Sequence, residues 1–290
     1  MKRTFITRKI TALAAIAVLA TIGTTTASAQ IIWTGAANDG LYSDGNNWQG
    51  DAPPADNGYQ DKGAEFNTGT ATITVPNGQT VSGIKFDTAG WTLSASTLMA
   101  GDISSSGTGT NTLTGIFDLY NGTTNFNGYA EDTFNVATGN TLSLGGMYEG
   151  GTNAIVTGGG TLFIGSLTNP GLSAGIGGYG EAAASFGLYL GSATLQIDAT
   201  EPYDTTGGAI FLTSSSSVLL LKGTAANAES YFGTEIVGQV SGGTLTAVNA
   251  GNGYAEVTDA AAVVPEPTTI AYLLTGGIGL ILIARRRARA

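Results

Sequence analysis

The chain has 290 residues, with 11 Lys and Arg against 21 Asp and Glu, which gives a formal net charge of −10 at pH 7. It contains no histidine and no cysteine, which excludes disulfides, thiolate chemistry and the Ser-His-Asp arrangement. Only 11% of the residues are charged, whereas 42% are hydrophobic. This composition is opposite to that of disordered chains.

A basic segment followed by an apolar one begins the chain. Lys2, Arg3, Arg8 and Lys9 precede an apolar run over 10–22, and Ala27-Ser28-Ala29 has the small residues of a cleavage site. This order is typical of a secretory signal peptide. An uncleaved anchor is the competing interpretation, but the run is short and the cleavage site is present. We predict that residues 1–29 are a signal peptide, with Ala27 and Ala29 at the cleavage site, and that the protein is exported.

The exported body is more acidic than the whole chain. Once the leader and the tail are set aside, only Lys62, Lys85 and Lys222 remain, against twenty acidic residues, a net charge of about −17. Such a surface repels phosphate groups, which excludes nucleic acid as a partner. The body also lacks arginine, so it offers no guanidinium group to hold an anionic substrate.

Residues 30–93 carry an ordered series of short motifs. The series consists of Trp33-Thr34-Gly35, Asn46-Asn47-Trp48, Ala52-Pro53-Pro54, Ala64-Glu65-Phe66, residues 81–86 and Trp91-Thr92-Leu93. It resembles the repeat-rich modules of autotransporter passenger domains. The resemblance implies that residues 30–93 are the opening coils of a right-handed β-helix. Nothing downstream resembles the outer-membrane barrel of an autotransporter.

Clustered oxygen side chains lie at the start of this region. Ca²⁺ prefers carboxylate and carbonyl oxygens as ligands, and such oxygens are carried here by Asp39, Asp44 and Asn46. However, the twelfth position counted from Asp44 is Ala55, so the EF-hand pattern fails. The same residue types are those that tight turns require. We expect turns here, keep the three residues as candidate ligands of Ca²⁺, and predict no other cofactor.

Residues 94–262 form a body rich in Gly, Thr and Ser that continues the pattern of the opening coils. Apolar residues alternate with polar ones over many short runs, which predicts short β-strands. The alternating residues are Ala71, Ile73, Val75, Ile84, Phe86, Trp91, Leu93, Ala95, Phe117, Leu119, Phe134, Val136, Leu142, Leu144, Leu162, Ile164, Phe186, Leu188, Leu190, Leu195, Ile197, Ile210, Leu212, Val218 and Leu220. The fold predicted is all-β.

A recurring Thr-Leu pair separates two all-β architectures. It occurs at Thr92, Thr112, Thr141, Thr161, Thr194 and Thr244, and two of the gaps are 20 residues. Coils of about 20 residues with inserted loops favour a parallel β-helix, or solenoid. A β-sandwich is the alternative.

The body offers few groups for catalysis. Carboxylates that could act in pairs on a polysaccharide are Glu131 with Asp132, Asp198 with Glu201 and Asp204, and Glu229 with Glu235. All lie in turn-like sequence, so we expect solvated loop residues. Gly175–Gly180 matches G-x-G-x-x-G without a strand-to-helix context, and we expect a loop. Loop tyrosines either stack on sugars or cover apolar surface; they are Tyr42, Tyr59, Tyr120, Tyr129, Tyr148, Tyr179 and Tyr203.

The last 28 residues, 263–290, combine three features. The motif Val264-Pro265-Glu266-Pro267 precedes an uncharged run over 268–284, which is followed by Arg285, Arg286, Arg287 and Arg289. As a helix the run covers about 25 Å, close to the hydrocarbon thickness of a bilayer, so we predict a single transmembrane helix here. The arginines favour a cytoplasmic end. The order resembles the PEP-CTERM sorting signal, which implies handling by a membrane protease-transpeptidase, exosortase, after passage through the general secretion machinery.

Two functions remain open from the sequence. The first is a non-catalytic structural or adhesive protein of the cell surface or extracellular matrix, with exopolysaccharide as a partner, as the PEP-CTERM resemblance implies. It would pass through an intermediate anchored in the inner membrane. The second is a carbohydrate-active β-helix enzyme that uses a carboxylate pair. We expect the first.

Overall fold

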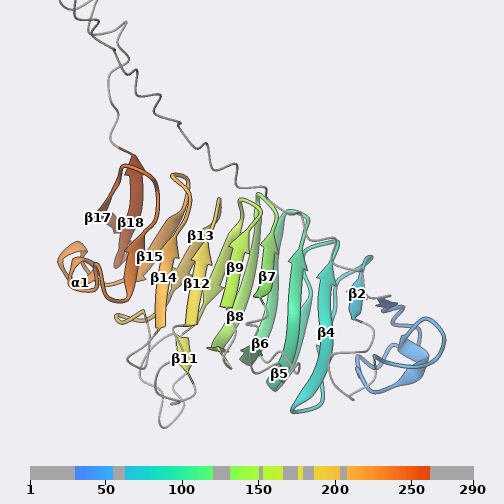
Figure 1. The fold of residues 1–290 in the computed structure, drawn as a ribbon. Helices are drawn as coiled ribbons and strands as arrows, with labels where there is room; N and C mark the ends of the chain where they lie inside the picture. Colours follow the sequence, from blue (N-terminus) through green and yellow to red (C-terminus); the bar gives the residue numbers. More distant parts are fainter. Residues whose placement is uncertain are drawn as a thin grey trace, which may run out of the picture.

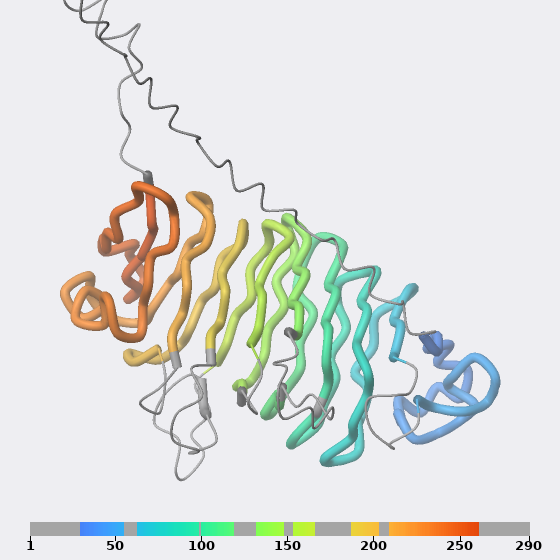
Figure 2. Tube along the Cα trace, viewed as in Figure 1, coloured from blue at the N-terminus to red at the C-terminus, as the bar shows by residue number. Residues whose placement is uncertain are grey.

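The computed structural model describes residues 30–54, 63–119, 131–149, 153–165, 176–178, 186–202 and 208–261. The regular secondary structure of these ranges is almost entirely β-strand, with one α-helix, α1 (Ala225–Glu229), and a short 3-10 helix, η1 (Gly45–Asn47). The predicted cleavage site, sorting motif and arginine cluster lie outside the described residues, as do Lys62 and Asp204. Figures 1 and 2 show the strands stacked side by side in sequence order along the molecule.

The strands form three parallel ladders, which we name A, B and C. Ladder A contains β1 (Ile31–Ile32), β2 (Ala64–Phe66), the end of β4 (Gln79–Phe86), the end of β5 (Thr92–Ser105), β7 (Glu131–Val136), β9 (Asn153–Thr157), β12 (Phe186–Leu190), β14 (Gly208–Leu212) and β16 (Ile236–Gly238). Ladder B contains β3 (Thr72–Thr74), the start of β5, the start of β6 (Gly109–Leu119), the start of β8 (Asn140–Glu149), β10 (Thr161–Ile164), β13 (Thr194–Ile197) and β15 (Val218–Lys222). Ladder C contains the start of β4, the middle of β5, the ends of β6 and β8, and β11 (Ile176–Gly178).

From β3 to β13 the chain thus visits ladders B, C and A in turn on each coil, and after β13 the described strands alternate between ladders A and B. Parallel pairing between successive coils is consistent with a β-solenoid and is not the antiparallel pairing usual in a β-sandwich. The all-β prediction is confirmed.

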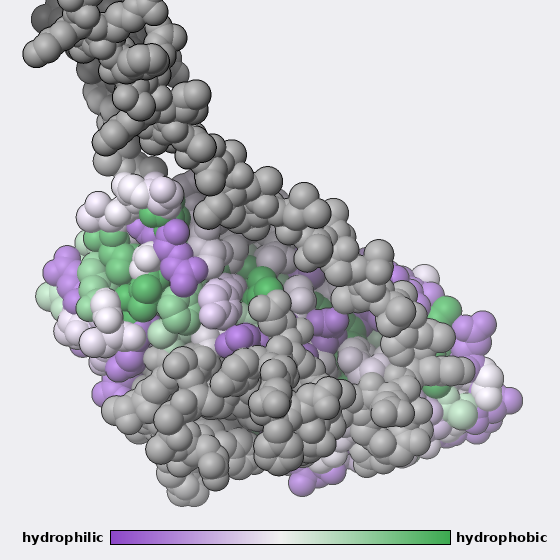
Figure 3. Space-filling view, in the orientation of Figure 1, coloured by the Kyte–Doolittle hydropathy of each residue, from purple (hydrophilic) through white to green (hydrophobic). Residues whose placement is uncertain are grey.

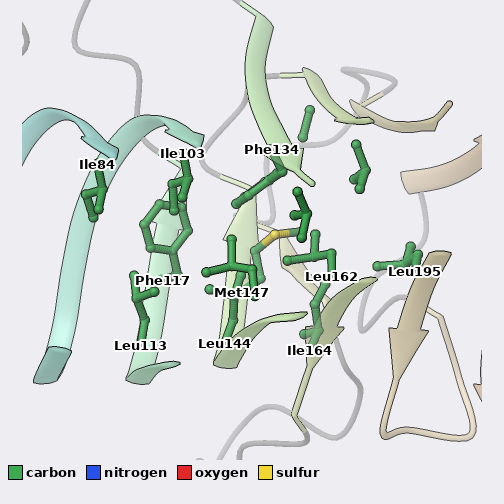
Figure 4. Close-up of a cluster of buried hydrophobic side chains, with 14 of the residues drawn as sticks. Ile84, Ile103, Leu113, Phe117, Phe134, Leu144, Met147, Leu162, Ile164 and Leu195 are labelled. Atoms are coloured by element: carbon green, nitrogen blue, oxygen red, sulfur yellow. The ribbon is translucent and has the colours of Figure 1, made fainter. Parts of the chain in front are cut away.

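The core is built from equivalent residues of successive coils. Ladder B stacks Ile73, Leu93, Leu113, Leu144, Ile164, Ile197 and Leu221, all of which are buried. Figure 4 shows Leu113, Leu144 and Ile164 in a row between the ladders. Because side chains alternate between the two faces of a strand, the Thr and Ser residues between them face outward. Each buried Leu or Ile stabilises the fold by about 1.5–3 kcal/mol relative to exposure.

Aromatic residues cover the first coil. Trp33 and Trp48 meet edge to face with ring centroids 5.0 Å apart, and Phe66 lies against both rings. The Trp48 indole Nε1 donates a hydrogen bond of 2.7 Å to the carbonyl oxygen of Tyr42. Tyr42 is 2% exposed and packs edge to face against the Trp48 ring, so it covers apolar surface, the second of the two interpretations of the loop tyrosines.

The last coil ends differently. Strand β15 pairs in the antiparallel direction with β18 (Tyr254–Ala261), and β18 forms a hairpin with β17 (Gly243–Gly251). Helix α1 lies near both strands of the hairpin, and its Ala225 amide donates a hydrogen bond of 2.8 Å to Asn249 Oδ1 of β17. The parallel stacking therefore ends at β15 in ladder B and at β16 in ladder A.

The register between coils that the Thr-Leu pairs predict is correct for part of the chain. Thr92 lies opposite Thr112, and Thr161 lies opposite both Thr141 and Thr194. Two steps were wrong. Thr112 lies opposite Ser143 because β6 is displaced by two residues from the expected match, and Thr194 lies opposite Val218.

The set of residues predicted to face the core was also wrong for one strand. In β15 the buried residues are Leu219 and Leu221, whereas Val218 and Leu220 are partly exposed. Four consecutive apolar residues carry no alternation. Only the neighbouring coil, whose Leu195 and Ile197 are buried opposite Leu219 and Leu221, sets which face is inside.

Candidate functional site

The first candidate, the loop that carries Asp39, Asp44 and Asn46, is a pair of tight turns. Asp39 Oδ1 accepts hydrogen bonds from the Leu41 amide at 2.9 Å and from Asn47 Nδ2 at 2.6 Å. Asp44 Oδ1 accepts from the amide and the side-chain nitrogen of Asn46, at 3.0 and 2.9 Å. The hydrogen bond from Leu41 and that from Asn47 lower the pKa of Asp39. The carboxylates thus hold the turns, as Asx turns do.

Metal-binding side chains do not gather elsewhere in the described ranges. No group of three or more Asp or Glu residues there is placed to hold a metal ion.

The carboxylate of Asp198 is engaged in structural contacts. Lys222 Nζ lies 2.8 Å from Asp198 Oδ1, and the Tyr254 hydroxyl donates to the same oxygen at 3.0 Å. Chiefly through the hydrogen bond from Lys222, the pKa of Asp198 is lowered. Because Tyr254 belongs to the final hairpin and Lys222 to β15, Asp198 ties consecutive coils to the C-terminal end.

The other described lysine is paired in the same way. Lys85 Nζ lies 2.8 Å from Glu65 Oε1 and 3.0 Å from Asp87 Oδ2. Glu65 and Lys85 are opposite residues on adjacent coils of ladder A. Both described lysines therefore neutralise carboxylates of their own chain.

A buried carboxylate lies on the outer side of ladder C. Asp118 is 6% exposed, and among the described residues its Oδ1 has no hydrogen-bond partner. Its neighbour Phe117 points into the core at 1% exposure, so alternation places Asp118 on the opposite face. Burial raises the pKa of Asp118 to about 6 because desolvation disfavours the charged form. Sequence reasoning missed this residue.

A second buried carboxylate lies on the same coil. Asp132 is 4% exposed and belongs to strand β7, so the expectation of a solvated turn was wrong for it. Asp118 lies opposite Met99 on the preceding coil. A Cβ atom placed on Gly101 would lie 3.5 Å from Asp132 Oδ1. The two aspartates thus lie next to Met99 and Gly101, which are two residues apart on β5.

The remaining sequence candidates do not join this pair. Glu229 ends α1 and Glu235 precedes β16, while Glu201 is exposed after β13. The glycine-rich match was expected to be a loop, but Ile176–Gly178 pairs with Met147–Glu149 as strand β11. Tyr148 belongs to β8 rather than to a loop. Of the other loop tyrosines, Tyr42 is described above, and Tyr59, Tyr120, Tyr129, Tyr179 and Tyr203 lie outside the described residues.

No protein-family model, no curated protein and no solved structure matches this chain. Among the helices of the described ranges, none has the length and apolar character needed to cross a bilayer.

Proposed function

We propose that this chain is an exported, non-catalytic structural or adhesive protein of the cell surface or extracellular matrix, sorted through its C-terminal tail. In this proposal the body is a right-handed parallel β-helix that projects its turns from the cell envelope. The observation that carries the proposal is the order of the tail: the Pro-Glu-Pro motif, an uncharged run and four arginines, in a chain that begins with a signal-like leader. Exosortase is the proposed processing partner.

Three features of the body support a passive scaffold. Its core is a continuous stack of aliphatic side chains, which gives a stiff rod. Its described lysines are engaged in ion pairs within the chain. The body is strongly acidic, so it suits a hydrated matrix of neutral exopolysaccharide and not a polyanionic ligand.

The sorting half of the proposal is tested with Glu266→Ala. The variant is expected to stay at full length in the inner membrane, while the wild-type chain is trimmed and leaves it. Glu229→Ala, which removes an exposed carboxylate from the body, is the matched control and is expected to be processed normally. Fractionation and intact mass measure both outcomes. Normal trimming of Glu266→Ala would contradict the proposal.

A second candidate function, hydrolysis or lytic cleavage of a polysaccharide, is favoured by one observation. Asp118 has a pKa of about 6 and shares a coil with the buried Asp132, and a carboxyl group with such a pKa is suited to act as a general acid near neutral pH. The test incubates the protein with neutral and acidic polysaccharides and measures reducing ends and unsaturated products. Asp51→Asn, a change at an exposed carboxylate, is the control. If products are lost in Asp118→Asn but persist in Asp51→Asn, the enzyme replaces the scaffold as the proposed function. Absence of products would leave the scaffold as the function.

A further inference from the structure

Strand β17 forms the outer edge of the hairpin at the C-terminal end of the stack. Its nine residues, Gly243–Gly251, pair with β18 on one side. Within the described residues β17 is in register with no other strand, since β16 pairs with β14. Figure 1 shows β17 beyond β18 at the end of the molecule. The hairpin turns at Asn252 and Gly253, which both have positive φ, as a two-residue turn requires.

The sequence of this edge lacks the usual protection against pairing. Edge strands are commonly short or carry charged residues or proline. Residues 239–251 contain no charged residue and no proline. On the outer face of the sheet Thr244, Thr246 and Val248 are exposed, and Val248 is 56% exposed. Figure 3 shows apolar surface at this end of the molecule.

The core-facing side of β17 is left only partly covered. Leu245 and Ala247 pack against the buried core but remain partly exposed. Their partners on β18, Asp259 and Val257, are buried at 2% and 0% exposure. One further strand beside β17 would extend the sheet and cover Leu245 and Ala247 as β17 covers its neighbours.

We propose that β17 pairs with β17 of a second copy of this chain, which joins two molecules end to end. Charge argues for this occupant: the body is strongly acidic, so two copies repel through most surfaces, whereas this edge is neutral. The following segment of the same chain is a poor occupant, because Pro265 and Pro267 lack the amide donors that a ladder needs.

Self-pairing is also sterically favourable in one register. Antiparallel pairing about Thr246 puts Leu245 opposite Ala247 of the second copy on the core-facing side. It puts Thr244 opposite Val248 of the second copy on the outer face. β-Branched and apolar cross-strand pairs of this kind stabilise antiparallel sheets. The inference goes beyond the proposed function and does not depend on it.

The test uses sedimentation of the full-length chain in mild detergent over a concentration series. The wild-type protein is expected to shift from the mass of one 29.2 kDa chain to twice that mass. The double variant Thr244→Lys/Thr246→Lys places like charges along the shared edge and is expected to stay at the mass of one chain. Thr244→Glu/Thr246→Glu is expected to do the same. An equimolar mixture of the two variants is expected to recover the doubled mass, because opposite charges then face each other at position 246, with those at position 244 on the diagonal.

Thr108→Lys/Thr138→Lys is the matched control, since both residues are exposed in turns between ladders A and B. It is expected to associate as the wild type does. Unchanged far-ultraviolet spectra establish that each variant folds. Three results would overturn the proposal: a wild-type mass of one chain at all concentrations, association that persists in both edge variants, or a mixture that fails to associate. Persistent association would place the contact elsewhere, for example in the apolar tail.

Discussion

The buried carboxylate of Asp118 makes the stability of the fold depend on pH in a specific direction. Its pKa rises from 3.8 to about 6 on folding, so the folded state binds a proton more tightly than the unfolded state. The free energy of unfolding therefore decreases as the pH rises from about 4 to about 6, and this loss is complete above the folded-state pKa. Below about pH 4 both states are protonated and the penalty disappears.

The magnitude follows from the shift. A change of about two pKa units corresponds to about 3 kcal/mol at most, and screening by water at the outer face reduces it to about 1–2 kcal/mol. Asp118→Asn removes the charge while it keeps the shape of the side chain. It is expected to stabilise the protein by about 1–2 kcal/mol at pH 7 and to have no effect at pH 3.5.

Urea denaturation followed by tryptophan fluorescence measures this difference, because Trp33, Trp48 and Trp91 are all buried. Wild type and variant are compared at each pH, so that contributions from the other groups cancel. Asp51→Asn is the control at an exposed position, and its effect is expected to stay within about 0.5 kcal/mol throughout. A difference for Asp118→Asn that does not change between pH 3.5 and 7 would refute the reasoning.

Three further predictions concern the stack, and denaturation midpoints check each of them. Leu144→Ala opens a cavity between two coils and is expected to lower the free energy of unfolding by about 2–5 kcal/mol. Ser143→Ala, on the outer face, is expected to lower it by less than about 0.5 kcal/mol. Equal effects would contradict the assignment of the inner face. Gly115 has a φ of +87°, and a Cβ atom there would meet backbone carbonyl oxygens of the preceding coil, whereas Gly78 has a φ of +73° but open space around it. Gly115→Ala is therefore expected to lower the free energy of unfolding clearly more than Gly78→Ala. A smaller loss at Gly115 would contradict this. The buried Asn111 accepts a hydrogen bond from the Trp91 amide through Oδ1 and donates through Nδ2 to the Thr88 carbonyl oxygen and the Ser105 hydroxyl. Asn111→Ala is therefore expected to lower the free energy of unfolding by about 2–4 kcal/mol, because these buried polar groups lose their partners. A neutral result would show that water replaces the side-chain amide.

Much of the fold was predictable from the sequence because a β-strand has a period of two. Where apolar and polar residues alternate strictly, as at Leu142 and Leu144 or Leu162 and Ile164, the predicted inner face is the buried one. The turn residues around Asp39 and Asp44 were predictable for a similarly local reason, since their side chains bond to amides two residues along the chain. Local rules suffice where the partners of a residue are its neighbours in sequence.

The candidate site was not predictable in the same way. Asp118 and Asp132 both look like ordinary outward positions of strands, and their burial depends on what covers the outer face of the ladders. Likewise, Tyr42 stands in a loop sequence but is buried, because it packs edge to face against Trp48 with ring centroids 4.8 Å apart. Contacts with distant parts of the chain decided these residues.

The amino-acid sequence alone determined the β-strand content, the acidic character of the body and the absence of thiol and imidazole chemistry, because these follow from composition and from short-range alternation. Only the tertiary structure decided the register between coils, the inner face of β15, the burial of Asp118 and Asp132, and the antiparallel hairpin that ends the stack. These features depend on which strands lie side by side. A repeat interrupted by insertions leaves that choice open until the coils pack against one another.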